Sequence, residues 1–372
     1  MGNHAKLNYI HIFRALAIII IVAGHCVDSS QEILTDFFNV FLKGGTALFV
    51  FIAGFLFQYL SDTFSYPIYL KKKFFNVVLP YLLTSVIGIT AIFLSSTPGP
   101  FAGLNKTVQV FMFLTTGFVH NFPTWYIPMT CILFLSAPVL LKLEKKTILN
   151  KYSLLFFILP LLLCVSSFFP RYETSFFVTK DMSAWQAYFG YLEKILFDIV
   201  LLFPIYILGM FFAKYKDTVI KEIYQKRIFV WIIFIIGCVL QFMLLYYNLL
   251  PSRLLFVNVV LILLILGYLR HYDEKIVAHS HINNILGIVA DYSFSVFFLH
   301  FYFVMRFNKI FENLFHWNNT YLSAENFHLG YWICYSGMKF IVAFFGSLFL
   351  AVLIKKFLEK LGVKHTRYFI GA

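Results

Sequence analysis

Charged side chains are scarce in this chain of 372 residues, where Asp, Glu, Lys and Arg together make up 13% of the sequence. An ordinary globular protein has about 25%, so the chain lacks the polar side chains that a water-exposed surface of this size requires. Hydrophobic residues make up 60% of the sequence. This composition excludes an ordinary water-soluble fold and indicates that lipid surrounds much of the chain.

Cysteine is also scarce, and the five cysteines are far apart in sequence, each in or at the edge of an apolar stretch. This spacing excludes a CxxC motif and argues against a disulfide framework, and no metal site is expected. No Pro/Gly/Ser linker and no internal repeat divides the chain, so we expect one transmembrane domain over residues 1–372 without an appended soluble domain. The first apolar run lacks an A-x-A cleavage site, which predicts a retained span rather than a signal peptide.

What the sequence does contain is a series of apolar segments close to the roughly 20 residues that cross a hydrocarbon core as a helix. They predict an all-α integral membrane protein with about ten transmembrane helices, near residues 9–28, 38–59, 75–95, 124–142, 153–169, 195–213, 228–247, 254–269, 283–304 and 333–354. Segment 107–118 is apolar but too short to span, and it predicts a half-helix or interfacial helix.

The net charge of +13 is better explained by membrane topology than by nucleic-acid binding, since no DNA- or RNA-binding motif is present. With these spans, 20 lysines and arginines fall in loops assigned to the cytoplasm and 7 in loops assigned outside. Cytoplasmic loops collect positive charge, which predicts that both termini are cytoplasmic. We expect a multi-pass protein of the cell membrane, most simply the bacterial cytoplasmic membrane, in contact with lipid.

Ionisable side chains inside a span are functional candidates because they are costly to bury. Arg14 and His25 are 11 residues apart in the first predicted helix. At 100° per residue they share one face, and a rise of 1.5 Å per residue separates them by roughly 16 Å. The pair is typical of a pathway through the membrane. In the alternative interpretation, Arg14 reaches lipid phosphates and His25 caps the helix at the interface.

The Arg-x10-His pattern resembles the acyltransferase-3 family of integral membrane acyltransferases, and further segments between about residues 8 and 305 are similar to that family in order and spacing. These segments are Gly45-Thr-Ala-Leu-Phe-Val-Phe-Ile-Ala-Gly54-Phe-Leu, Phe203-Pro-Ile-Tyr-Ile-Leu-Gly209-Met, Thr124-Trp125-Tyr126 and Tyr292-Ser-Phe-Ser-Val-Phe-Phe-Leu-His300. The chain departs from the family where members usually carry Arg-x-x-Arg before a proline, because Lys73 and Asn76 stand there before Pro80. Lysine binds phosphate only as a point charge, so donor binding is expected to be either weaker or arranged differently here.

The resemblance implies transfer of an acyl group, usually acetyl, from cytoplasmic acyl-CoA to a hydroxyl of a cell-surface or lipid-linked glycan. It implies that His25 is the catalytic base, and that Arg14, Lys73 and Asn76 contact the acyl-CoA, whose phosphates a basic cluster attracts. Acetyl-CoA would be a donor substrate rather than a bound cofactor, and no tightly bound cofactor is expected. Without the resemblance, the Lys71–Lys73 cluster is explained more simply as a positive-inside anchor.

Three further residues are candidates for substrate binding. Lys43 lies at the predicted depth of His25, Trp125 flanks an outer loop where a glycan ring can stack, and His300 belongs to the last family-like segment. Each has a structural alternative. In these alternatives Lys43 borders an aqueous cavity, Trp125 and the neighbouring His120 fit an interfacial aromatic belt, and His300 fits a packed polar group.

The remaining ionisable residues favour structural roles. Asp198 lies inside the sixth predicted span and needs a partner, with Lys43 or Lys339 as candidates. Glu193 and Lys194 lie at the outer end of that span and are expected to be solvated. Asp291 is expected to begin a helix, where its charge suits the helix dipole.

Two other functions fit the same composition. An exporter or flippase for a glycan also needs many spans and intramembrane charges, but it would not consume acyl-CoA. A structural partner in a polysaccharide synthase complex would not need His25.

Overall fold

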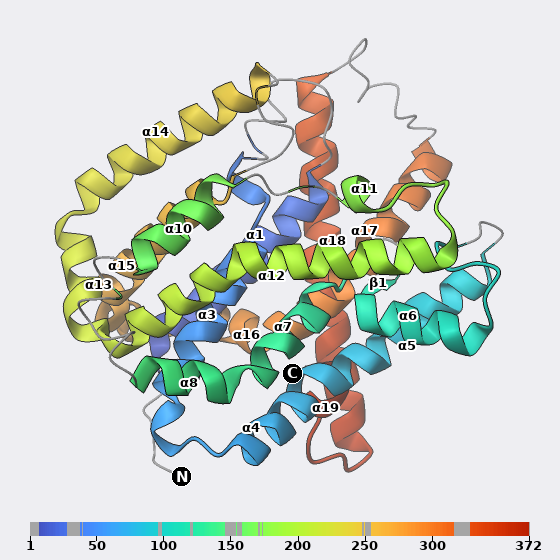
Figure 1. The fold of residues 1–372 in the computed structure, drawn as a ribbon, viewed down its shortest axis with the longest axis horizontal. Helices are drawn as coiled ribbons and strands as arrows, with labels where there is room; N and C mark the ends of the chain where they lie inside the picture. Colours follow the sequence, from blue (N-terminus) through green and yellow to red (C-terminus); the bar gives the residue numbers. More distant parts are fainter. Residues whose placement is uncertain are drawn as a thin grey trace.

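The computed structural model describes residues 7–27, 38, 40–95, 99–119, 122–145, 154, 158–169, 172, 174–247, 249, 254–315 and 328–371. Within these residues the regular secondary structure is helical apart from two antiparallel two-residue strands, β1 (Phe118–Val119) and β2 (Phe122–Pro123). The predicted all-α class is therefore confirmed (Figure 1).

Among the described residues, seven helical segments are long and apolar enough to cross a membrane, by length and composition. They are α1 (Asn8–Cys26), Val40–Tyr59 with α3 (Thr46–Tyr59), Tyr66–Phe93, α12 (Ala184–Lys214), α14 (Arg227–Tyr246), α15 (Phe256–Ala278) and α18 (Leu329–Lys360). The segment Tyr66–Phe93 consists of α4 (Tyr66–Lys73), the π-helical turn η2 (Phe74–Val78) and α5 (Leu79–Phe93).

Two further helix pairs are apolar enough when taken together but have a sharp bend, and if each pair is one span the described residues hold up to nine. The bend is 52° between α7 (Tyr126–Leu135) and α8 (Ala137–Lys145), and 70° between α16 (Ser280–Asp291) and the start of α17 (Ser293–Phe315). The span predicted over 283–304 therefore contains a sharp bend at Tyr292, between α16 and α17. Asp291 ends α16 instead of beginning a helix, and its carboxylate lies 3.5 Å from Nε2 of His11.

The shorter helices are α6 (Lys106–Thr116), α10 (Leu159–Phe168), α11 (Thr174–Phe177), α13 (Lys216–Gln225), α19 (Arg367–Ile370) and the 3-10 turn η1 (Ser61–Thr63). The short helix predicted over 107–118 is confirmed as α6. The span predicted over 153–169 appears as the ten residues of α10, and part of that range lies outside the described residues. The span count of ten stays a prediction.

Helix α1 lies at the centre of the bundle and packs against α3, α15, α16, α17 and α18. Helix α12 crosses α3 in close contact, because two glycines let the backbones meet. A Cβ added at Gly54 would lie 2.0 Å from the carbonyl oxygen of Tyr206, and one added at Gly209 would lie 2.1 Å from that of Phe51.

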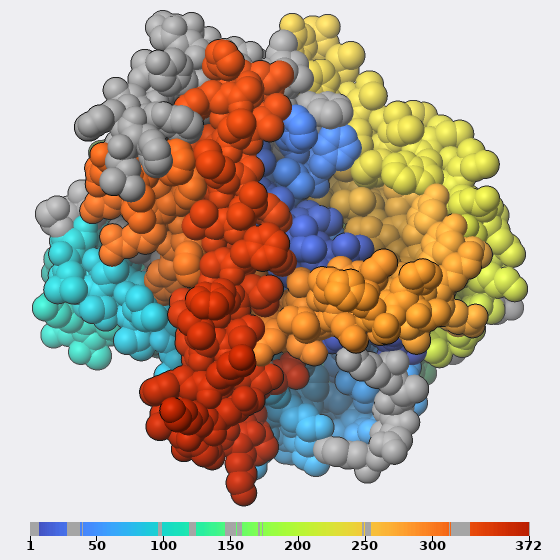
Figure 2. All heavy atoms as spheres, turned by 180° about the vertical axis from the view of Figure 1, so that it is seen from behind, coloured from blue at the N-terminus to red at the C-terminus, as the bar shows by residue number. Residues whose placement is uncertain are grey.

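The outer helices present apolar side chains to their surroundings, as lipid-facing helices do. Figure 2 shows α18 running along one face of the molecule. Large exposed apolar residues lie along both α14 and α18, among them Ile228, Phe229, Ile235 and Ile236 on the first, and Ile333, Ile341, Phe345 and Phe349 on the second. In water such surfaces would associate, so they support a multi-pass membrane protein.

The predicted orientation can be tested by labelling single cysteines in intact cells, after replacement of the five native cysteines. The positions suited to this test are Lys180, in the exposed turn before α12, and Lys221, on the exposed face of α13. We expect a membrane-impermeant maleimide to label Lys180→Cys and to leave Lys221→Cys unlabelled until the membrane is opened. Labelling of Lys221→Cys in intact cells would contradict the orientation.

Candidate functional site

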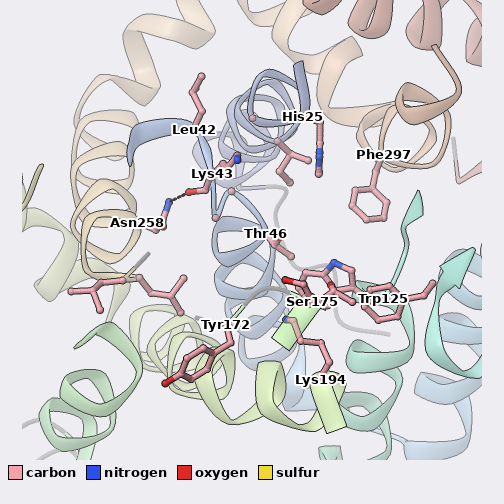
Figure 3. A pocket seen from close by; sticks show the side chains of 18 of the residues that line it. His25, Leu42, Lys43, Thr46, Trp125, Tyr172, Ser175, Lys194, Asn258 and Phe297 are labelled. Atoms are coloured by element: carbon pink, nitrogen blue, oxygen red, sulfur yellow. Dashed lines mark hydrogen bonds between the residues drawn. The ribbon is translucent and has the colours of Figure 1, made fainter. Parts of the chain in front are cut away.

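A cavity of about 510 Å³ opens beside the end of α1 that carries His25 (Figure 3). Its wall comes from α1, the turn before α3, α12, α15 and α17, together with residues near α7 and α11. The side chains labelled in Figure 3 that carry polar groups are His25, Lys43, Thr46, Trp125, Tyr172, Ser175, Lys194 and Asn258. A partly polar cavity between apolar helices is the usual form of a small-molecule site.

His25 lies in the last turn of α1, and its ring is partly exposed. It packs against His300 on α17, with ring centroids 5.3 Å apart and an interplanar angle of 38°, and against Phe301, at 5.7 Å. The sequence marked both histidines as candidates without predicting that they meet. In the structure His25 lines the cavity, whereas His300 lies beside it and is fully buried.

The hydrogen bonding of His300 fixes which of its ring nitrogens carries the proton when the ring is neutral. Its Nδ1 lies 2.9 Å from the carbonyl oxygen of Val296, and because a carbonyl can only accept, Nδ1 is the donor. Nε2 is then an acceptor, and it is buried without a hydrogen-bond partner among the described residues. A buried, unsatisfied acceptor beside His25 is costly and is the kind of feature expected at a functional site.

Lys43 lies in the turn that precedes α3 and lines the cavity. Its backbone carbonyl accepts a hydrogen bond of 3.3 Å from Nδ2 of Asn258, a buried residue of α15. The next residue, Gly44, has φ +91°, and a Cβ there would lie 2.5 Å from the Asn258 side-chain oxygen. Asn258 therefore holds the turn that brings Lys43 to the cavity, and no motif in the sequence marks it for this role.

Trp125 and Lys194 form the opposite wall of the cavity. The Nζ of Lys194 lies 5.6 Å from the ring centroid of Trp125, within range of a cation–π interaction. It also lies 2.5 Å from Oδ2 of Asp198, one helical turn further along α12. The prediction that Lys194 is solvated is wrong, since its exposed fraction is 5%. Glu193 is exposed, as predicted, and His120 lies outside the described residues.

The prediction for Lys194 was wrong because α12 begins at Ala184, eleven residues before the predicted span, so Lys194 lies inside the helix and not at its end. A capping box starts the helix there. The Ser183 hydroxyl oxygen accepts a hydrogen bond from the backbone N–H of Gln186, and the Gln186 side-chain oxygen accepts one from the backbone N–H of Ser183. This Ser-x-x-Gln pattern is a helix-start signal readable in the sequence. Asp198, fully buried, thus has an ion-pair partner on its own helix.

The other end of α1 carries Arg14, whose guanidinium donates a hydrogen bond of 3.0 Å to Oγ of Ser293, the first residue of α17. Because His25 also contacts α17, the prediction that Arg14 and His25 share one face of α1 is confirmed. Their common face is turned towards α17, which begins beside Arg14 and passes His25 further along.

Lys73 and Asn76 lie where α4 gives way to the π-helical turn η2, a feature often found at functional sites. The Nζ of Lys73 lies 4.7 Å from the ring centroid of Phe134, and the charge of Lys73 interacts with that of Arg14. Asn76 instead donates a hydrogen bond of 2.7 Å to the carbonyl oxygen of Lys72. The structure therefore groups Lys73 with Arg14 at one end of α1, and groups Lys43, Trp125 and His300 around His25 at the other.

The structure is thus that of a membrane-spanning helical bundle, with basic side chains near Arg14 of the central helix α1 and a histidine-lined cavity at the other end of that helix. Comparison with known families gives the class: the acyltransferase-3 family model, described as an acyltransferase domain, matches residues 7–363. The chain therefore belongs to this family of membrane acyltransferases. Neither the comparison with curated proteins nor that with solved structures gives a match.

Proposed function

We propose that this protein transfers an acyl group, most simply acetyl, from acyl-CoA at the cytoplasmic face to a hydroxyl of a surface or lipid-linked glycan. The acyl-transfer part of this proposal follows from membership of the family. The direction of transfer and the role of His25 are supported by the arrangement along α1. Arg14 lies near Lys73 at one end of this helix, and His25 lines the cavity at the other end.

The cavity suits a sugar as the acceptor. Trp125, Phe118 and Phe297 offer aromatic surface on which the apolar face of a sugar ring can pack. Ser175 and Thr46 offer hydroxyl groups for its polar edge. The acceptor hydroxyl would lie against His25.

In the proposed reaction His25 acts as the base for that hydroxyl. As its ring takes the proton, the hydroxyl oxygen attacks the thioester carbonyl carbon, a C–O bond forms and the C–S bond breaks. The thiolate of CoA leaves and takes up the proton, so the products are an O-acyl ester and free CoA. The acyl-pantetheine arm has to cover about the 16 Å that separates Arg14 from His25 at 1.5 Å per residue.

The reaction class is tested by mass spectrometry of surface glycans from cells with and without the gene. We expect an ester-linked acyl group that disappears on deletion and returns with the wild-type gene but not with His25→Ala. Purified protein should also consume acetyl-CoA in the presence of the glycan identified in this way. An exporter would change the amount of surface glycan without consuming acetyl-CoA, and that result would contradict the proposal.

Sidedness is tested with sealed vesicles of known orientation, because donor and acceptor are proposed to reach His25 from opposite faces. Acetyl-CoA is supplied to one face only, with the glycan accessible from the other. We expect product only when acetyl-CoA is at the face that carries Arg14 and Lys73. Equal product from either face would refute the cross-membrane arrangement while leaving acyl transfer in place.

A further inference from the structure

The last described residues of the chain fold back onto the end of the bundle that carries Arg14. The short helix α19 packs against α5, η2, α17 and α18, as Figure 1 shows beside α5. Thr366 and Ile370 are buried, and the ring of Tyr368 lies 4.9 Å from that of Phe75 in η2. These contacts fix the position of α19 against the segment that holds Lys73 and Asn76.

Glycine is required where this segment ends. Gly371 has φ +80°, and a Cβ there would lie 2.9 Å from the Cβ of Phe294, the residue after the Ser293 that Arg14 contacts. The C-terminal segment is thus seated at the start of α17, within one residue of the Arg14 contact. Arg367 belongs to the same segment and is exposed.

Three cations from distant parts of the sequence come together as a result. The charge of Arg367 interacts with that of Arg14 and with that of Lys73, and those two interact with each other. Asp291 offsets part of this charge, but its side chain is 64% exposed. A fold that holds like charges together against their repulsion favours a ligand with several negative charges.

We propose that Arg14, Lys73 and Arg367 form one binding site for the nucleotide phosphates of acyl-CoA, with the C-terminal segment supplying the second guanidinium. This inference rests on the proposed function. Asn76 carries no charge where the family pattern has an arginine, and it bonds to its own turn. Arg367, from the C-terminal segment, provides a second guanidinium near Arg14 and Lys73. A guanidinium binds phosphate with two parallel hydrogen bonds.

The test measures binding of CoA and of acetyl-CoA to the purified full-length protein, comparing wild type with Arg367→Gln. We expect binding of both to weaken about ten-fold, as loss of one charge-assisted hydrogen bond implies, and the salt dependence of binding to decrease. The matched control is Lys364→Gln, an exposed residue three positions earlier, which should bind as wild type does. Since Arg367 is exposed, accumulation and thermal stability of the variant should be unchanged.

Acetyl-pantetheine, which lacks the nucleotide and its phosphates, separates a phosphate contact from a structural role. We expect wild type and Arg367→Gln to use it as a donor equally well. Wild-type affinity for CoA in Arg367→Gln, or an equal loss with acetyl-pantetheine, would overturn the inference while leaving the proposed function in place. Failure of wild type to bind CoA at all would instead overturn the donor assignment, and the inference with it.

Discussion

Replacing His25 with alanine is expected to lower acyl transfer about 10²–10⁴-fold, the usual contribution of a general base. The ring lines the cavity and is partly exposed to it, so its loss removes the proton acceptor without breaking a protein hydrogen bond among the described residues. Binding of CoA at the Arg14 end should change little. The measurement is the initial rate of glycan acylation, with CoA affinity determined on the same preparation.

The matched control is His281→Ala, which removes an exposed histidine from α16 and should leave the rate unchanged. His300→Asn is informative in a different way, because asparagine keeps a polar group beside His25 but loses the ring that packs on it. We expect a smaller loss of rate and an altered pH profile, as for a positioning residue. Near wild-type activity in His25→Ala would remove His25 from the reaction.

Replacing Asp198 with alanine is expected to destabilise the protein by about 3–5 kcal/mol, the usual cost of leaving one member of a buried ion pair without its partner. Asp198 is fully buried and Lys194 is 5% exposed, with their charged atoms 2.5 Å apart. The variant should accumulate poorly in the membrane and lose its structure at a lower temperature. Thermal unfolding of the purified protein in detergent measures the effect.

The double variant Lys194→Met with Asp198→Leu removes both charges and keeps apolar volume, so much of the stability should return. Acylation should stay low in this variant, because Lys194 lines the cavity beside Trp125. Glu193→Ala, an exposed carboxylate on the same helix, is the control and should behave as wild type. If Asp198→Ala were as stable as wild type, the pair would have no structural role.

Interactions within one helix were predictable, and those between helices were not. The shared face of Arg14 and His25 follows from the period of α1 alone. Lys194 could have been recognised as buried from the Ser-x-x-Gln helix start, because Asp198 then lies one turn away on the same helix. The 70° bend before α17 was not foreseen from hydropathy, because the apolar pattern of 283–304 continues across Tyr292. The helix start expected at Asp291 lies two residues before the start of α17 at Ser293.

The sequence by itself determined that this protein is a helical membrane protein of the acyltransferase-3 family, because hydropathy, helix period and short motifs are local properties of the chain. Only the tertiary structure decided which polar side chains meet. It brought His300 to His25, Asn258 to the turn of Lys43, and Arg367 to Arg14. The physical reason is that these contacts depend on close approaches at glycines, such as Gly44 against Asn258 and Gly371 against Phe294, and on the bend before α17. These features set the relative positions of segments far apart in sequence.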